Sequence, residues 1–304
     1  MNYIIGSGLV AFIAKKLYPE YKIIPLGKSR YFSFDVATCD DYIYCNPKID
    51  DFIRQYSLNN TFIPILFKRA LSISGELIFS QQHGFFKNWL NKVYGENYEP
   101  YTHKLFKFDS FVYSTSCIDL FKILEREAKP DFKEFIVSNN KLLSINVNEK
   151  YIQTQNGILD YNNIINTIPL DAFCKYSNIQ NDLESSDIHT FMIRTNKLDF
   201  EGATELLVAD EAIDFYKCTR IGKETYQFYS TKEIIDLTRY IDSFVDKYDL
   251  LNATVVRNSM PIGNDNGLCD FLSKHNIYCV GSNAQWDDFM DIGSCIMRLQ
   301  NYNL

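Results

Sequence analysis

The chain has 304 residues, of which 46% are hydrophobic and 23% are charged, and its formal net charge is −7. This length suits two domains, or one domain with a large insertion. Lys and Arg are spread thinly, which argues against a nucleic-acid-binding protein, although a substrate carried on nucleic acid stays open. No apolar run reaches the about 20 residues of a membrane span, so we expect no membrane partner.

The eight Cys residues have no C-x-x-C spacing, and the chain contains four His. Both features argue against a zinc site, and we expect no metal. Scattered thiols are typical of reducing compartments, and the chain starts on an apolar strand rather than a basic leader, which favours a cytoplasmic protein. Whether it forms a homo-oligomer stays open.

The first eleven residues, M-N-Y-I-I-G-S-G-L-V-A, place a glycine-rich loop between a strand at 2–5 and a helix at 8–18. The spacing G-x-G-x-x-A matches the dinucleotide fingerprint. Gly6 would allow the tight turn, Gly8 the close approach of a pyrophosphate, and Ala11 the packing of helix on strand. The loop residues predicted to bind the dinucleotide are Gly6, Ser7, Gly8, Leu9, Val10 and Ala11.

The next segments extend this β-α-β opening. We expect a second strand at 21–26, with Pro25 near its end, because proline cannot donate a ladder hydrogen bond. Helices are predicted at 47–57, with Pro47 in the first turn, at 84–94, and at 117–127, capped by Ser114, Thr115 and Ser116.

The second half of the chain is predicted to contain many short strands. Asn156-Gly157 is a strong hairpin signal between two of them. Periodic apolar residues predict a long helix at 232–248, and a last helix is expected at about 288–300. The strands are expected at 133–137, 142–147, 151–155, 158–160, 162–168, 189–195, 204–208, 214–220, 225–229 and 277–280.

Three segments together resemble one family. They are I-I-G-S-G-L-V-A at 4–11, Y-N-N-I-I-N-T-I-P-L at 161–170, and N-I-Y-C-V-G-S-N-A-Q-W-D-D-F-M-D-I-G-S-C-I at 276–296. They are similar to the FAD-dependent amine-oxidase-like group, which includes protoporphyrinogen oxidases and UDP-galactopyranose mutases. A weaker match is D-F-Y-K-C-T-R-I at 214–221, which resembles the family's aromatic-aromatic-Arg strand.

The resemblance implies an α/β fold with a doubly wound, Rossmann-like FAD-binding domain and an inserted α+β substrate domain. The FAD-binding domain would comprise 1–46, 106–172 and 250–304. The substrate domain would comprise 47–105 and 173–249.

The resemblance also implies where FAD would lie. Thr167 and Pro169 would approach the adenosine side, Gly281 and Ser282 would follow a strand end, and the backbone at Asp291 and Ile292 would face the flavin's pyrimidine edge. Trp286 would wall the flavin or, equally, belong to the core. Cys279 and Cys295 are expected to be buried thiols rather than covalent flavin attachments.

Several positions depart from the family pattern. The second strand lacks the terminal Glu or Asp that binds ribose, so Lys28 or Arg30 is expected to hold the adenosine half. The glycine pair that usually follows is absent. The stretch D-D-Y-I-Y-C-N at 40–46 has no His where the mutases have G-P-H-I-F-H, and Ser282 stands where the family commonly has Arg.

The leading hypothesis is an FAD-dependent oxidoreductase that oxidises a C–N, C–C or C–O bond of a small or carrier-borne substrate by hydride transfer to flavin N5. Candidate substrate-binding residues are Lys217, Arg220, Arg257 and Tyr101, each also readable as an ordinary surface or structural residue, and no catalytic residue is assigned. One alternative is a redox-neutral flavin enzyme, mutase- or lyase-like, acting on a sugar nucleotide or modified nucleotide. Another is a degenerate, non-catalytic FAD-binding partner subunit.

Overall fold

The computed structural model describes residues 1–26, 42–56, 62–73, 76–79, 83–94, 109–116, 120–126, 141–221, 223–286 and 292–302. The chain forms two compact units, each assembled from separate segments. Unit 1 comprises Met1–Ile63, Tyr113–Glu184 and Gly263–Leu304, and unit 2 comprises Pro64–Val112 and Ser185–Ile262.

The unit boundaries differ from the ranges expected from the sequence. Residues 47–63 and 173–184 belong to unit 1, although the sequence assigned them to the substrate domain. Residues 106–112 and 250–262 belong to unit 2, although the sequence assigned them to the FAD-binding domain. The reason is packing: Ile49, Phe52 and Ile53 join the core of unit 1, whereas 250–262 continue a strand of unit 2.

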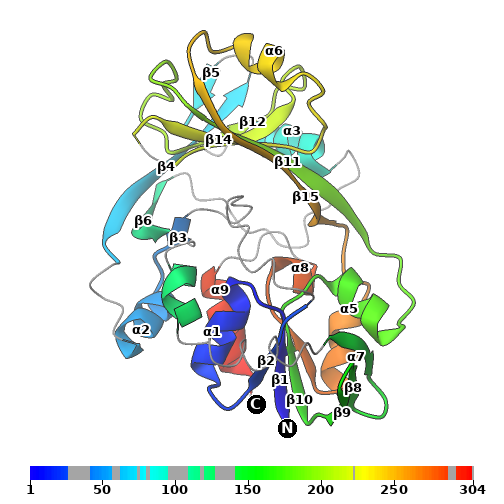
Figure 1. Ribbon diagram of the computed structural model, residues 1–304. Helices are drawn as coiled ribbons and strands as arrows, with labels where there is room; N and C mark the ends of the chain where they lie inside the picture. The colour runs from blue at the N-terminus through cyan, green and yellow to red at the C-terminus, as the bar shows by residue number, and fades with distance from the viewer. Residues whose placement is uncertain are drawn as a thin grey trace. The chain divides into compact units, whose positions relative to one another are not determined.

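A four-stranded parallel sheet forms the centre of unit 1 (Figure 1). Its strand order is β16-β10-β1-β2, and every neighbouring pair is parallel. The strands are β1 (Asn2–Ile5), β2 (Lys22–Ile24), β10 (Asn163–Asn166) and β16 (Ile277–Cys279). β2 stops immediately before Pro25, as the missing N–H of proline predicts.

Both faces of this sheet are covered, which explains why its strands are almost wholly apolar. Helices α1 (Leu9–Leu17) and α9 (Ile292–Asn301) lie on one face, where they share a core with α2 (Pro47–Gln55). The other face carries α5, α7, α8 and a three-stranded antiparallel sheet. These elements are α5 (Leu170–Ser177), α7 (Leu268–Lys274), α8 (Ser282–Gln285), β7 (Leu142–Asn146), β8 (Tyr151–Thr154) and β9 (Gly157–Asp160).

Unit 2 is built on a larger, mainly antiparallel sheet with the order β15-β11-β14-β13-β12-β4-β6, in which β12 and β4 run parallel. The helix α3 (His83–Tyr94) packs against it, and its Trp89 indole N–H donates to the carbonyl of Tyr216 at 2.8 Å. The strands are β4 (Pro64–Ile73), β5 (Glu76–Ile78, paired with β4), β6 (Asp109–Ser116), β11 (Glu184–Arg194), β12 (Glu205–Val208), β13 (Phe215–Arg220), β14 (Thr225–Ser230) and β15 (Asp249–Ile262).

Strand β6 ends with Ser114–Ser116, and the described helix at 120–126 lies within the predicted range 117–127, whose first three residues are outside the described residues. One expectation about local structure is corrected. The helix predicted at 232–248 is only α6 (Leu237–Asp242), because the Asp236 side chain caps its start by accepting from Arg239 N at 3.0 Å. Its apolar neighbours pack on the sheet from irregular backbone instead.

Strand β15 was not expected from the sequence, and the strand predicted at 133–137 lies outside the described residues. The Asn156-Gly157 hairpin is confirmed, since β8 and β9 pair in antiparallel register around it. No helix in the described part of the chain is long and apolar enough to span a membrane.

Candidate functional site

The carboxyl ends of the parallel strands meet at one edge of unit 1. Ile5 pairs with Ile24 on one side and with Asn166 on the other, and Asn166 pairs with Cys279. The chain after β1 leads to β2 on one side, whereas β10 and β16 lie on the other side, so β1 marks the switch point of the sheet. Open α/β sheets bind ligands outside the carboxyl ends of their strands at such a point.

Gly6 occupies a position that only glycine can take. Its φ is +122°, and a Cβ built there would lie 2.2 Å from Oγ1 of Thr167. The Thr167 hydroxyl donates to the carbonyl of Ile5 at 2.8 Å, so it cannot withdraw without breaking that hydrogen bond. Gly6 and Thr167 therefore act together to join the ends of β1 and β10. Thr167, which the sequence predicted to approach the adenosine side of FAD, therefore has a structural role in joining these strand ends.

Gly8 differs from Gly6 because the space beside it is open. It precedes α1 with φ −85°, and a Cβ at Gly8 would meet no atom within 4 Å. No side chain caps the helix, and its first turn contains no acidic residue. The N–H groups of that turn and the helix dipole thus face a space that suits an anion such as a pyrophosphate.

The turn after β16 packs against the same helix start. Gly281 has φ +112°, and its Cβ position would lie 3.6 Å from Cγ2 of Val10 in the first turn of α1. Ser282 begins α8 directly after this turn. The structure therefore brings the loop after β1 and Val10, which follows it directly, together with the Gly281 turn near the other end of the sequence.

Four other predicted cofactor residues lie in the cores of unit 1 or at a helix start. Trp286 ends α8 with φ +57° and is buried in the core beneath the sheet with Leu170 and Phe173. Pro169 precedes α5 and accepts the hydrogen bond from Phe173 N at 2.9 Å. Leu9 and Ala11 lie in α1 and are buried in the core between that helix and the sheet.

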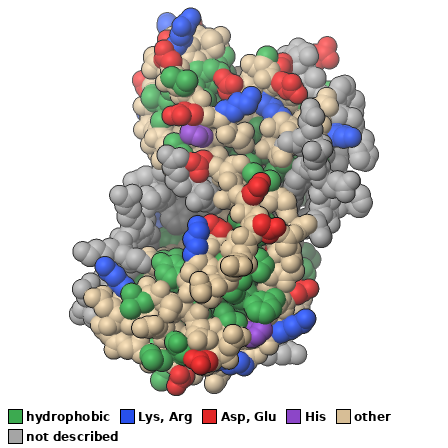
Figure 2. All heavy atoms as spheres, turned by 90° about the vertical axis from the view of Figure 1, so that its right-hand side faces the viewer, with side chains coloured by type: hydrophobic (Ala, Val, Ile, Leu, Met, Phe, Trp, Pro, Cys, Tyr) green, Lys and Arg blue, Asp and Glu red, His purple; other side chains and the backbone are tan. Residues whose placement is uncertain are grey.

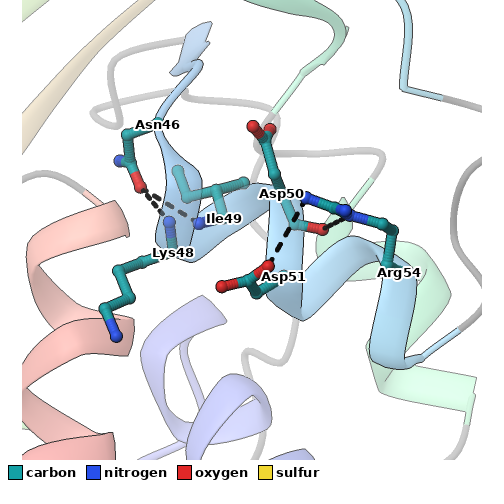
Figure 3. Close-up of polar contacts among 6 residues, drawn as sticks. All are labelled: Asn46, Lys48, Ile49, Asp50, Asp51 and Arg54. Atoms are coloured by element: carbon teal, nitrogen blue, oxygen red, sulfur yellow. Dashed lines mark hydrogen bonds and ion pairs between the residues drawn. The ribbon is translucent and has the colours of Figure 1, made fainter.

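The start of α9 meets the start of α2. Asn46 Oδ1 accepts hydrogen bonds from the N–H groups of Lys48 and Ile49, both at 3.0 Å, and so caps α2 (Figure 3). A Cβ at Gly293, the second residue of α9, would lie 2.0 Å from Nδ2 of Asn46. Ile292 packs into the same core. Two helix N-termini thus converge at Asn46, a residue that sequence reasoning did not select.

A polar cluster lies inside the sheet edge at Asn166 and Cys279. The Asn166 side chain donates to Sγ of Cys279 at 3.6 Å and to the carbonyl of Ile168 at 3.3 Å. A hydrogen bond from Cys269 lowers the pKa of the Cys279 thiol, and the contacts with Asn166 and Arg298 lower it further. Cys279 and Cys295 are both buried.

Unit 2 presents one polar and one apolar sheet face. Residues in register across neighbouring strands alternate between the faces. The apolar row is Ala70, Leu206, Cys218, Phe228 and Phe191. The next row, on the opposite face, is Arg69, Glu205, Thr219, Gln227 and Met192.

The polar face is also buried. Arg69 Nε donates to Oε1 of Glu205 at 2.5 Å, and both side chains are at most 6% exposed. Lys217 lies on the same face, with its Nζ 4.3 Å from the centre of the Tyr229 ring. Burying charged side chains is costly unless they are paired, and the ion pair of Arg69 with Glu205 meets this requirement.

The substrate-binding residues predicted from the sequence are not all brought together. Lys217 and Arg220 are three residues apart on β13 and therefore point to opposite faces, and Arg220 donates to the carbonyl of Lys223 at 2.9 Å. Arg257 lies in β15, and its side chain is outside the described residues, as are Lys28, Tyr101 and Asp291. Sequence reasoning missed Arg69 and Glu205, because the pair forms only through the parallel pairing of β4 with β12.

Charged side chains do not gather into a basic surface on the face shown in Figure 2, where described Lys and Arg side chains lie among Asp and Glu side chains. Within the described residues, His, Cys, Asp and Glu side chains also form no group able to hold a metal ion. The features that suggest a ligand are therefore the sheet edge of unit 1 and the polar face of unit 2.

The fold places the chain in a known structural class. No protein-family model and no curated protein sequence matches it. Among solved structures, reduced UDP-galactopyranose mutase is similar over 97% of this chain and 91% of that one, with a TM-score of 0.64 and 10% identity.

Two further structures have the same architecture. One, assigned as a protoporphyrinogen oxidase from Exiguobacterium, is similar over 98% of this chain and 96% of its own, with a TM-score of 0.62 and 10% identity. An oxidoreductase from Methanosarcina mazei matches over 98% of each chain, with a TM-score of 0.59 and 10% identity. The resemblance read from the three sequence segments is confirmed at the level of the fold.

Proposed function

We propose that the chain is a flavoenzyme that binds FAD in unit 1. The observation that carries this proposal is the uncapped start of α1 beside open space at Gly8, at the switch point of a parallel sheet. A doubly wound FAD-binding domain with an inserted substrate domain is the organisation that this proposal implies for the two units. The fold shared with the mutase and oxidoreductase structures supports it.

The residues of unit 1 fit the cofactor. The backbone of Ser7, Gly8 and the first turn of α1 would bind the pyrophosphate, and the contact between Gly6 and Thr167 fixes the loop that presents these groups. The first turn of α9, held against Asn46, supplies a second set of N–H groups for a partly anionic ring edge. When bound, FAD supplies hydride acceptance at its N5 atom.

The residues of unit 2 fit a polar substrate. Lys217, which is half-buried with its Nζ over the ring of buried Tyr229, offers a positive charge, and the ion pair of Arg69 with Glu205 holds the neighbouring row in place. These groups orient a substrate that carries an anionic or hydroxyl-rich part. We propose oxidation of a C–N, C–C or C–O bond in such a substrate as the reaction.

A redox-neutral reaction on a sugar nucleotide is the second candidate. The structural similarity to reduced UDP-galactopyranose mutase favours it. The two reactions differ in their electron balance. An oxidase transfers two electrons from its substrate to an acceptor in every turnover, whereas a mutase transfers no net electrons and needs no acceptor.

The visible absorbance spectrum of the purified protein, with mass spectrometry of any released cofactor, tests the proposal. We expect a flavin spectrum and FAD in stoichiometric amount. Colourless protein that takes up no added FAD would contradict it and would favour a non-catalytic partner subunit. Oxygen consumption with substrate supports the oxidase, and anaerobic turnover that requires prior reduction supports the redox-neutral reaction.

A further inference from the structure

Helix α8 carries buried amide groups that have no partner among the described residues. Both amide atoms of Gln285, Nε2 and Oε1, are buried without a hydrogen bond, and so is Oδ1 of Asn283. Gln285 as a whole is only 7% exposed. Each buried group without a partner costs about 1–3 kcal/mol, and native proteins contain few of them.

The position of α8 connects these amides with the proposed cofactor site. Gln285 N donates to the carbonyl of Gly281 at 2.9 Å, so Gln285 lies one helical turn beyond the turn that packs against Val10. Its neighbours Ala284 and Trp286 belong to the apolar core and offer no side-chain acceptor there. The packing around α8 therefore explains why Gln285 is buried, but it gives no hydrogen-bond partner to the side-chain amide.

The chemistry of the three atoms narrows the group that would satisfy them. Two are acceptors, Oε1 of Gln285 and Oδ1 of Asn283, and one is a donor, Nε2 of Gln285. A pyrophosphate offers only hydrogen-bond acceptors, so it could accept from Nε2 of Gln285 but could not donate to Oε1 or to Oδ1 of Asn283. Hydroxyl groups donate and accept, so a chain or ring with several hydroxyls satisfies all three atoms.

We propose that Gln285, together with Asn283, binds sugar hydroxyls of the cofactor, either those of the ribityl chain or those of the adenosine ribose. This inference rests on the proposed function, because it takes FAD as the ligand of unit 1. It explains why an amide is kept in an apolar setting.

The test compares Gln285→Met, a replacement of similar size without polar atoms, with wild type in two measurements. The first is urea unfolding of the cofactor-free protein, where we expect the variant to be at least as stable as wild type, since a buried unsatisfied amide has been removed. The second is FAD binding by fluorescence quenching, where we expect affinity to fall about tenfold. The exposed Gln300→Met on α9 is the matched control and should change neither measurement.

Smaller ligands identify which hydroxyls are bound. Weaker binding of riboflavin with unchanged binding of lumiflavin, which lacks the ribityl chain, assigns Gln285 to the ribityl hydroxyls. Weaker binding of ADP assigns it to the adenosine ribose. Either result supports the inference.

Two results overturn the inference while leaving the proposed function intact: equal FAD affinity in wild type and Gln285→Met, or a destabilised cofactor-free variant, which would make the amide structural. Failure of the wild-type protein to bind FAD, riboflavin and ADP would instead contradict the proposed function itself. The two failures are therefore distinguishable.

Discussion

The two sheets of the molecule differ in where they place their polar groups. The parallel sheet of unit 1 has an apolar core on each face, buries the polar Asn166 at its carboxyl edge, and presents polar backbone groups there around Gly6 and Gly8. The sheet of unit 2 is apolar on one face and carries a buried row of polar side chains on the other. The backbone groups at the edge of unit 1 come from one short stretch of sequence. The polar side chains of unit 2 meet only because strands distant in sequence pair with each other.

The largest effect is expected from breaking the side-chain arrangement of unit 2. Arg69→Met leaves Glu205 as a buried charge without its ion-pair partner, and we expect a loss of about 3–5 kcal/mol in the free energy of unfolding. Urea denaturation measures it. Lys68→Met, at an exposed neighbouring position of the same strand, is the control and should stay within about 0.5 kcal/mol of wild type.

The double variant Arg69→Met with Glu205→Leu sharpens this prediction. Removing both charges leaves no buried ion to solvate, so most of the lost stability should return. If Arg69→Met alone proves neutral, the ion pair does not organise the polar face.

The backbone arrangement of unit 1 is tested at Gly6. Gly6→Ala forces a side chain into a glycine-only conformation and against Oγ1 of Thr167, and we expect a loss of about 3 kcal/mol. The matched variant Gly8→Ala has open space and an ordinary φ, and should cost less than about 1 kcal/mol. Equal losses at the two glycines would contradict the different roles assigned to them.

A smaller effect is expected where α9 meets α2. In most helices Gly→Ala is stabilising by up to about 1 kcal/mol, but Gly293→Ala should destabilise by about 1–2 kcal/mol because its Cβ meets the Asn46 amide. Asn46→Ala should itself cost about 1 kcal/mol through loss of the α2 cap. A double-mutant cycle measures the coupling, and simple additivity would disprove the contact.

The smallest effect concerns Lys92, which links α3 to the sheet of unit 2. Its Nζ donates to the carbonyls of Asp210 and Phe215, and burial lowers its pKa from 10.5 to about 8. Between these two pH values the unfolded chain binds more protons than the folded protein, so this group makes stability rise with pH. The gain is modest because Lys92 is only partly buried.

The variant Lys92→Met should lack this rise from about pH 8 to 10.5, while Lys87→Met, exposed on the same helix, should keep it. Thermal or urea unfolding at a series of pH values gives the difference between each variant and wild type. A parallel pH dependence in wild type and Lys92→Met would show that the amine titrates as it does in water.

The parts of the molecule that follow from local sequence were predicted well. The strand, loop and helix at the start of the chain depend on residues within a short stretch, and so does the hairpin at Asn156-Gly157. The mixed α/β class followed because several such stretches occur in a characteristic order.

The parts that depend on long-range pairing were missed. Arg69 and Glu205 come together only because β4 and β12 pair in parallel across more than a hundred residues of sequence, which no local pattern encodes. The buried amide of Gln285 is equally invisible in sequence, since burial arises from the packing of α8 on distant segments. The predicted helix at 232–248 failed because tertiary packing overrode an apolar periodicity.

We propose that the open space at Gly8 receives the pyrophosphate of FAD. Titration of FAD into wild-type protein and into Gly8→Val, with urea unfolding of both cofactor-free proteins, tests it most directly. We expect a folded variant of near wild-type stability that no longer binds FAD. Stoichiometric FAD binding with unchanged affinity in Gly8→Val would contradict it.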